Sequence, residues 1–424
     1  MKKIAVISIA LIVGLTWACK KKDSDPVNAV TIEKKSELYY YVTLDFAKAT
    51  HYEIGAQFAT KIRQIMPEYE QLLDVGLAEV LSELEQAGIS FSVLLNRAKN
   101  IQPQLHSDFN DEILGMCSVF SYPTDSIGDG HLSANEFLVY QLFADVGRPT
   151  QCSASGVYGS TSSTGKSIIG RNLDWYESPN YVYNKIHSIT VFKNGSKSFL
   201  NVGFLGQLGI VSALSSSGVF ASILDDDSGE PYPSTEGKRS YPFDIRYCLE
   251  NNTSLIDIAD YLRIQPYTFS HIAFLANENT VKVLENDLNG GDRHLRSDTS
   301  LLKPGYSWGI QDAIATVNCN LLPKNCSNGY DSVDMKRWRN FKMLYTDYTD
   351  LGKISVDEIK LITGFPSTDG NAALSGAIFR SKVYPSLQSI VYDYDNYEMW
   401  IAFAPIGPMP FTPTYIRVLS ENPF

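Results

Sequence analysis

Two neighbouring stretches decide the fold prediction: Gln-Cys-Ser-Ala-Ser-Gly-Val-Tyr at residues 151–158 and Ile-Ile-Gly-Arg-Asn-Leu-Asp-Trp at residues 168–175. A turn through Gly165 separates them, so together they predict a β-hairpin. Antiparallel pairing returns the end of the second strand to the start of the first. Arg171 and Asp174 are therefore expected beside Cys152. A guanidinium there favours the thiolate form of a cysteine, and a carboxylate can hold the arginine or orient an amine.

The pattern of apolar and turn residues changes at Cys152. From about residue 44 to 150, apolar residues recur at helical spacing, and Ser133 with Glu136 fits a capping box. After Cys152, hairpin signals such as Asn194-Gly195 alternate with helical patterns. Those helices are expected at about 241–250, 254–264, 331–348 and 355–363. Hairpins make antiparallel sheets whose faces the helices must cover, which predicts a layered α+β fold.

This hairpin resembles the choloylglycine hydrolase and acid ceramidase superfamily of N-terminal nucleophile hydrolases. That superfamily includes N-acylethanolamine amidases and penicillin acyltransferase-like peptidases. The resemblance rests on Cys152-Ser153 followed by Gly-Arg-Asn-Leu-Asp at residues 170–174, with softer matches over about residues 45–420. It implies a four-layer αββα sandwich preceded by a helical pro-segment.

The same resemblance implies a mechanism. Cleavage between Gln151 and Cys152 would free an α-amine that acts as the base for its own thiol. Arg171 would position Cys152, Asp174 would bind the new amine, and Asn318 would donate to the oxyanion. The remaining site residues implied in this way are Arg337 as a later arginine of the site, and Asn172 and Ser215 near the oxyanion hole.

Alternatives stay open for several of these residues. Cys152 could be a buried free thiol, because unpaired cysteines are usually core residues. Asn320 competes with Asn318, and Arg339 competes with Arg337. Ser215 stands where the superfamily commonly has asparagine, three residues before a glycine.

The N-terminus predicts export. Lys2 and Lys3 precede an apolar run that is too short to span a membrane comfortably and typical of a signal peptide. Cys19 ends a stretch that resembles a bacterial lipobox, which implies a lipid-anchored lipoprotein in the periplasm or on the cell surface. The expected segments are therefore a signal peptide at 1–18, a tether at 19–43, a helical α-subunit at 44–151 and a catalytic β-subunit at 152–424.

Composition and motifs argue against other classes of function. The net charge is −11, and no cluster of Lys and Arg residues interrupts it. Because phosphate contacts need such clusters, no nucleic-acid partner is expected. The six histidines form no metal-ligand pattern, and no cofactor is expected. The segment from Asp125 to Glu136 has partial EF-hand spacing but lacks a ligand at its third position. The run Asp225-Asp226-Asp227 is expected to be a solvated strand end, or else to border the pocket.

The cysteine count also points to one reactive thiol. Without Cys19, five cysteines remain, an odd number for an oxidising compartment. Cys319 and Cys326 are close enough to form a disulfide, but sequence does not fix the pairing.

The sequence thus predicts an exported hydrolase of linear amides that cleaves N-acyl amides, such as fatty acyl ethanolamides or acyl amino acids. Alternatives are a conjugated bile salt hydrolase or an acyltransferase of the same fold. An alternative from another class is a surface lipoprotein that only binds its ligand. The oligomeric state does not follow from the sequence.

Overall fold

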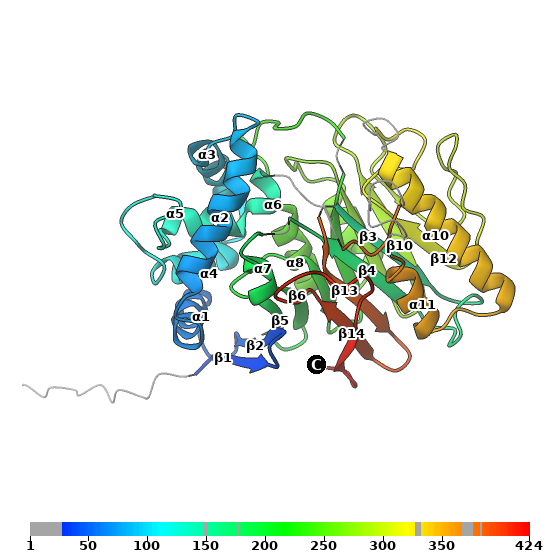
Figure 1. The fold of residues 1–424 in the computed structure, drawn as a ribbon, viewed down its shortest axis with the longest axis horizontal. Helices are drawn as coiled ribbons and strands as arrows, with labels where there is room; N and C mark the ends of the chain where they lie inside the picture. Colours follow the sequence, from blue (N-terminus) through cyan, green and yellow to red (C-terminus); the bar gives the residue numbers. More distant parts are fainter. Residues whose placement is uncertain are drawn as a thin grey trace, which may run out of the picture.

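Two β-sheets and the helices around them form an α+β fold (Figure 1). This computed structural model describes residues 28–147, 151–176, 178–226, 228–326, 332–366, 376–381 and 384–424. Among these residues, no helix combines the length and the apolar composition needed to cross a membrane. The predicted signal peptide and Cys19 lie outside the described residues.

The larger sheet has nine strands, and all neighbours are antiparallel except β2 and β5. Its strands, in spatial order, are β1 (Val30–Lys35), β2 (Tyr39–Asp45), β5 (His187–Lys193), β6 (Phe199–Phe204), β7 (Ser212–Ser215), β8 (Phe220–Asp225), β9 (His271–Asn277), β10 (Thr280–Asn286) and β11 (His294–Arg296). The smaller sheet has six strands in the order β12 (Ala313–Thr316), β3 (Gln151–Val157), β4 (Ile168–Asp174), β13 (Ser386–Asp393), β14 (Glu398–Phe403) and β15 (Ile416–Leu419).

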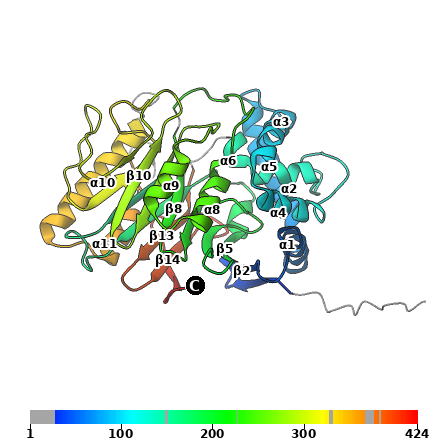
Figure 2. The same cartoon turned by 180° about the vertical axis from the view of Figure 1, so that it is seen from behind.

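Helices cover the outer faces of both sheets. On the nine-stranded sheet, α8 (Tyr241–Asn251) contacts β7 and α9 (Leu255–Leu262) contacts β9, and Figure 2 shows both helices from that side. On the six-stranded sheet, α10 (Ser332–Leu351) contacts β12, while α11 (Val356–Thr363) lies across β4 and β13. The sheets face each other where β3 meets β8 and where β10 meets β12. Helices and sheets therefore lie in layers.

The N-terminal helices gather beside this sandwich (Figure 1). They are α1 (His51–Ile65), α2 (Tyr69–Glu85), α3 (Phe91–Ile101), α4 (Ser107–Cys117), α5 (Ala134–Gln141) and α6 (Phe143–Val146), with a 3-10 turn at Gln102–Gln104. A further short helix, α7 (Val182–Lys185), packs against α2.

The segment with partial EF-hand spacing is arranged around a carboxylate. Asp74 of α2 accepts the N–H groups of Gly128 and Gly130, each at 2.7 Å. Glu136 and Ser133 form the predicted capping box at the start of α5. The Glu136 carboxylate accepts the N–H of Ser133. Capping of α5 therefore explains why a glutamate stands at this position.

The prediction of a tether over residues 19–43 was wrong for its second half. Residues 30–45 form the hairpin of β1 and β2, and β2 joins the nine-stranded sheet as a parallel neighbour of β5. The reason lies in the alternation along β2, where Tyr40, Val42 and Leu44 are buried and their neighbours are half-buried. The N-terminal segment therefore supplies strands to the sheet as well as helices beside it.

The hairpins predicted after Cys152 are confirmed. The runs around Asn194-Gly195 pair as β5 and β6, and the pairs β9–β10 and β13–β14 also form. Three short strands, β11, β12 and β15, were not predicted, because each has only three or four residues and no clear alternation. Of these, β12 matters most, because it pairs with β3 and leads directly to Asn318.

Candidate active site

The register of the β3–β4 hairpin decides which side chains share a face. Cys152 lies opposite Leu173, and Ala154 lies opposite Arg171. Residues directly opposite each other, and residues two apart on one strand, point to the same side of a sheet. Cys152 and Arg171 therefore point to the side where β3 meets β8 of the other sheet. Asp174 points to the opposite side, toward α10 and α11.

The thiol of Cys152 has a guanidinium beside it. The side chain of Cys152 is fully buried, and Nη2 of Arg171 lies 3.5 Å from its sulfur. The same Nη2 donates to the carbonyl of Ile223 on β8, at 2.9 Å, which fixes the guanidinium between the two sheets. A positive charge at this place stabilises a thiolate.

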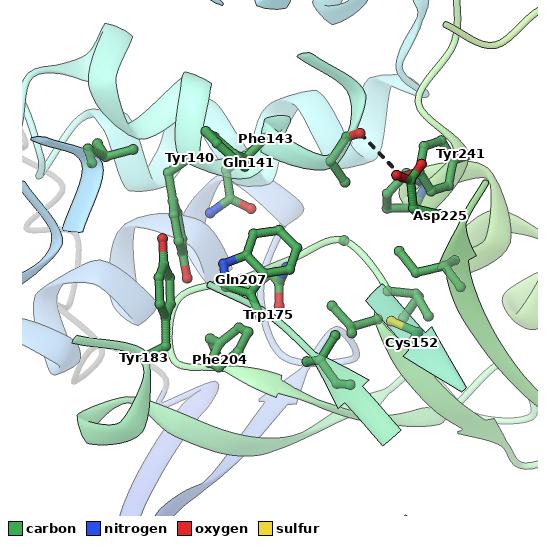
Figure 3. Close-up of a pocket in the computed structure, with 18 residues that line it drawn as sticks. Tyr140, Gln141, Phe143, Cys152, Trp175, Tyr183, Phe204, Gln207, Asp225 and Tyr241 are labelled. Atoms are coloured by element: carbon green, nitrogen blue, oxygen red, sulfur yellow. Dashed lines mark hydrogen bonds between the residues drawn. The ribbon is translucent and has the colours of Figure 1, made fainter. Parts of the chain in front are cut away.

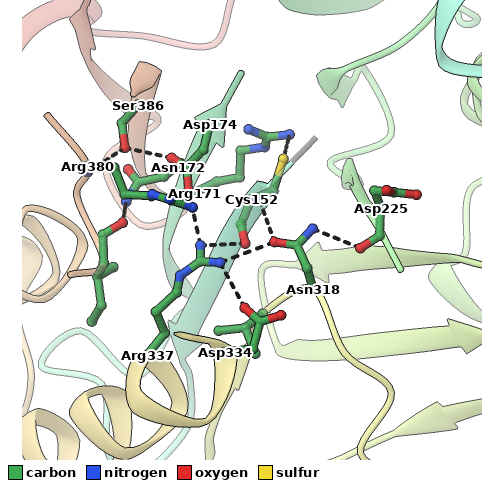
Figure 4. A network of polar contacts seen from close by, with 12 residues as sticks. Cys152, Arg171, Asn172, Asp174, Asp225, Asn318, Asp334, Arg337, Arg380 and Ser386 are labelled. Carbon is green, nitrogen blue, oxygen red and sulfur yellow. Dashed lines mark hydrogen bonds and ion pairs between the residues drawn. The ribbon is translucent and has the colours of Figure 1, made fainter. Parts of the chain in front are cut away.

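Arg337 contacts the site from the side of α10 and bonds to several of its residues (Figure 4). It is fully buried on α10, and its Nη2 donates to the carbonyl oxygen of Cys152 at 2.7 Å and to Asp174 at 3.1 Å. Its Nη1 donates to Asn318 at 3.2 Å and to Asp334 at 3.0 Å. By contrast, Arg339 is exposed and contacts Met335. Of the two arginines, Arg337 is therefore the one that lies beside Cys152.

The backbone nitrogen of Cys152 is held by Asn318. The N–H of Cys152 donates to Oδ1 of Asn318 at 2.6 Å, and Nδ2 of Asn318 donates to the carbonyl of Asp225 at 2.8 Å. Asn320 instead bonds to Asp226 and to the carbonyl of Cys326. Asn318 is therefore the asparagine at the site, but it holds the nitrogen of Cys152, where donation to an oxyanion was expected.

Asp174 is fully buried among cations and does not take the nitrogen of Cys152 in this uncut chain. Its Oδ2 pairs with Arg337, and its Oδ1 accepts the hydroxyl of Ser386 at 2.6 Å. Burial raises the pKa of Asp174, and the guanidiniums of Arg337 and Arg380 oppose that shift. Removing one partner of such a buried pair costs about 3–5 kcal/mol, because the other charge stays buried.

Asn172 and Gly170 serve the packing of α11 against β4. Nδ2 of Asn172 donates to the carbonyls of Thr363 and Ile378, on the face away from the thiol. A Cβ on Gly170 would lie 2.0 Å from the Thr363 hydroxyl oxygen, so only glycine lets the helix approach this closely. The predicted place of Asn172 near the oxyanion hole is therefore wrong.

Ser215 is also not at the site. It ends β7 in the turn toward β8, where its hydroxyl accepts the N–H of Val219 at 3.1 Å and lies 2.8 Å from that of Ser217. That turn borders a separate surface pocket with Asn277 and Tyr397. The three-residue offset to Gly218 in the sequence belongs to a hairpin turn, and so it gave a wrong prediction.

An elongated, mostly apolar cavity opens beside the thiol (Figure 3). The helical segment contributes Leu77, Tyr140, Gln141, Phe143 and Ala144 to its wall. The sheet part contributes Cys152, Leu173, Trp175, Tyr183, Phe204, Gln207, Gly209, Ile210, Val211, Ile223, Asp225, Tyr241 and Pro242. In Figure 3, Cys152 and Asp225 lie near one end, and Tyr140, Tyr183 and Phe204 lie near the other. Such a wall suits an acyl chain.

The other thiols of the described chain have different surroundings. None of the five described cysteines forms a disulfide, so Cys319 and Cys326 are not joined. Burial raises the pKa of Cys117 to about 12 and raises those of Cys248 and Cys319 above the ordinary value. A raised pKa keeps a cysteine in the unreactive thiol form.

Several residues of the site were missed from the sequence. Asp334 and Ser386 anchor Arg337 and Asp174, yet each is a common polar residue at the start of an element. Asp225 borders the cavity, which was the less favoured reading of its acidic run, and Asp226 is fully buried against Asn320. Asp227 lies outside the described residues. No sequence pattern marked Asp334 or Ser386 as partners of Arg337 and Asp174.

Comparisons with known proteins give distant likenesses only. No protein-family model and no curated protein matches the chain. An N-acylethanolamine-hydrolyzing acid amidase ortholog from Caenorhabditis elegans is 14% identical, with a TM-score of 0.39, over 58% of this chain and 96% of that one. A variant of conjugated bile acid hydrolase from Clostridium perfringens is 10% identical, with a TM-score of 0.34, over 59% of this chain and 89% of that one. Penicillin V acylase from Agrobacterium tumefaciens is 10% identical, with a TM-score of 0.33, over 62% of this chain and 85% of that one.

These three proteins are N-terminal nucleophile hydrolases, and the chain is similar to them in part of its structure. At such scores the likeness assigns no activity to this chain, because unrelated functions recur on one fold.

Proposed function

We propose that this protein is an amidase of the N-terminal nucleophile class, which cleaves N-acyl amides through a thioester on Cys152. One observation supports the proposal most. A single cysteine has a guanidinium at its sulfur, a carboxamide on its nitrogen and a second guanidinium on its carbonyl, and it borders an apolar cavity. A structural thiol needs none of these contacts.

The first chemical step is self-cleavage between Gln151 and Cys152. The sulfur of Cys152 attacks the carbonyl carbon of Gln151, the C–N bond breaks, and the acyl group moves to sulfur while the nitrogen takes up a proton. Water then hydrolyses the thioester, which leaves a carboxylic acid on Gln151 and a free amine on Cys152. The hydrogen bond from the Cys152 nitrogen to Asn318 supports this step, because it already fixes the nitrogen that becomes the amine.

The second step is turnover of substrate. A free α-amine has an ordinary pKa of about 7.7–8.0, so near neutral pH it can accept the proton of its own thiol. The sulfur attacks the amide carbonyl, the amine of the substrate leaves, and water releases the acyl group from sulfur. Arg171 stabilises the thiolate, and Asn318 with Arg337 keeps the nitrogen and the backbone of Cys152 in place.

The helical segment stays bound after the cut. Gln141 bonds to the carbonyl of Gly206 and to the N–H of Leu208, and Glu112 pairs with Arg246 where both side chains are fully buried. The parallel pairing of β2 with β5 also joins the two parts. Because residues 77–144 supply one wall of the cavity, the mature enzyme is a complex of both fragments, which we propose are residues up to 151 and 152–424.

We further propose that the protein is exported and anchored through a lipid on Cys19. The lipobox-like stretch before Cys19 and the basic, apolar N-terminus support this. In a bacterial host, the full chain should label with palmitate and sediment with membranes. The Cys19→Ser variant should do neither, and a soluble wild-type protein would contradict the anchor.

Self-cleavage is the property to test first. Residues 20–424 should separate into two fragments, one of which begins with Cys152 by N-terminal sequencing. Cys152→Ala should give one uncut chain, whereas the matched control Cys248→Ala, which removes a buried thiol away from the site, should still be cut. A wild-type chain that stays whole after mild acidification and reduction contradicts the mechanism and favours a protein that only binds its ligand.

A further inference from the structure

Gln207 is a polar residue of the cavity wall, and its side-chain oxygen has no hydrogen-bond partner among the described residues. It lies in the turn after β6, where its backbone N–H donates to the carbonyl of Phe204 at 3.0 Å. Gly206 takes the left-handed conformation that this turn requires, with a φ of 83°. Backbone atoms therefore hold the turn, and the turn does not need a glutamine side chain.

Other polar side chains of the same wall have partners or polar neighbours. Gln141 bonds through both atoms of its amide to backbone groups of the β6–β7 turn. The hydroxyl of Tyr140 lies beside that of Tyr69. The hydroxyl of Tyr183 lies beside the indole of Trp175. The protein itself therefore offers a polar contact to each of these groups.

The position of the Gln207 amide suits contact with the middle of an acyl chain. A Cβ on Gly203 would lie 2.8 Å from Oε1 of Gln207, so a glycine on β6 leaves room for the amide. In Figure 3, Cys152 lies near one end of the cavity, and Tyr140 and Tyr183 lie near the other. Gln207 is drawn between the two ends. A chain that runs from the thiol to the tyrosines therefore passes Gln207 with its middle carbons.

A carboxamide at this place has a chemical consequence. A plain hydrocarbon chain packed against Gln207 leaves the amide without a partner, and a buried polar group left unpaired costs about 1–3 kcal/mol. A hydroxyl on the chain removes this cost, because it can donate to Oε1 or accept from Nε2. A site that hydrogen-bonds a hydroxyl of the substrate discriminates against the analogue that lacks it.

We propose that Gln207 selects N-acyl amides that carry a hydroxyl group in the middle of the acyl chain. This inference rests on the proposed amidase function and names the acyl class of its substrate. A saturated chain without a hydroxyl still enters the cavity, because most of the wall is apolar, but it reacts more slowly.

The test uses dodecanoyl ethanolamide and three forms of it that carry a hydroxyl on the second, the sixth or the twelfth carbon of the acyl chain. With self-cleaved wild-type enzyme, kcat/KM for the sixth-carbon form should exceed that for the plain amide about tenfold, which is the effect of one neutral hydrogen bond. Gln207→Met keeps an unbranched side chain and removes the amide, so this preference should disappear. Gln64→Met, at an exposed position of α1, should retain it.

The outcomes separate the two proposals. If the plain amide is cleaved as fast as the hydroxylated forms, or if Gln207→Met keeps the preference, the role of Gln207 is wrong while the amidase stands. A gain only for a hydroxyl on the second or the twelfth carbon also contradicts that role. If no amide is cleaved by a chain that has cut itself, the amidase function fails and this inference fails with it. The wild-type comparison needs no substitution, so it decides the question even where Gln207→Met does not fold.

Discussion

The two sides of Cys152 differ in their chemistry. On one side, Arg171, Arg337 and Asn318 surround the sulfur, the carbonyl and the nitrogen of the same residue. On the other side, aromatic and aliphatic side chains form most of the cavity wall. The polar side holds Cys152 in place and suits bond cleavage. The cavity suits the selection of a substrate. Substitutions on the polar side should thus slow or stop every reaction, and substitutions in the cavity should change which substrate reacts.

The largest effect is expected from Arg337→Met. It removes the guanidinium that pairs with the buried carboxylates of Asp174 and Asp334, so the free energy of unfolding should fall by about 3–5 kcal/mol. Self-cleavage should stop, because the Cys152 carbonyl loses its donor. Urea unfolding and fragment masses measure both effects. The matched control is Arg339→Met on the exposed face of α10, which should change stability by less than about 0.5 kcal/mol. A stable, self-cleaving Arg337→Met variant would remove Arg337 from the site.

Asn318→Ala should slow self-cleavage about a hundredfold, because misplacement of a reacting atom by about 1 Å has an effect of this size. Asn320→Ala is the control on the same loop. It also loses buried hydrogen bonds, at a cost of about 1–3 kcal/mol in stability, but it does not touch Cys152. Time courses of fragment formation compare the two variants. Equal rates would show that Asn318 only supports the loop.

On the cavity side, Phe204→Trp should reduce the acyl length that fits, because Phe204 lies at the end of the cavity away from Cys152 (Figure 3). The larger ring should lower kcat/KM for a hexadecanoyl amide about tenfold to a hundredfold and leave a butanoyl amide nearly unchanged. Phe411→Trp, at an exposed position, serves as the control. Equal losses for both acyl lengths would mean that the acyl chain binds elsewhere.

The last prediction concerns stability alone and Asp145, a buried carboxyl behind the cavity wall that accepts the N–H of Tyr241. Burial raises its pKa to about 8, from an unfolded value near 3.8. Between these values the unfolded chain has lost the proton and the folded chain keeps it. The contribution of Asp145 to stability is therefore greatest below about pH 4 and is lost progressively as the pH rises toward about 8.

Asp145→Asn keeps an acceptor for the N–H of Tyr241 and removes this dependence of stability on pH. Urea unfolding at about pH 5 and about pH 7 should show the variant gaining on the wild type as pH rises. Asp257→Asn, an exposed carboxyl, should run parallel to the wild type. If the Asp145→Asn curve is also parallel, Asp145 is ionised in the folded protein.

The sequence predicted the polar side far better than the cavity side. Cys152, Arg171 and Asp174 lie on one hairpin, and strand pairing alone brings them together. Asn318 and Arg337 were expected only from the family resemblance, and their rivals were excluded by burial and partners that only three dimensions supply.

The cavity could not be predicted, because its wall is assembled from residues that are far apart in the chain, from Leu77 to Pro242. Pattern reasoning identified those residues only as apolar faces of helices and strands. The error at Ser215 has a similar origin: a residue offset from a glycine was taken as a site signal, although a hairpin turn also produces it. The strands β1 and β2 were missed because the polar residues before them suggested a tether throughout.

The most direct test of Cys152 as the nucleophile is to trap the acyl group on it. The self-cleaved enzyme is mixed with decanoyl p-nitroanilide, quenched in acid within the first turnover, and digested for peptide mass mapping. The account predicts one decanoyl group, labile to hydroxylamine, on the peptide that begins with Cys152. Release of nitroaniline without an acyl group on Cys152, or with the acyl group on another residue, would contradict it.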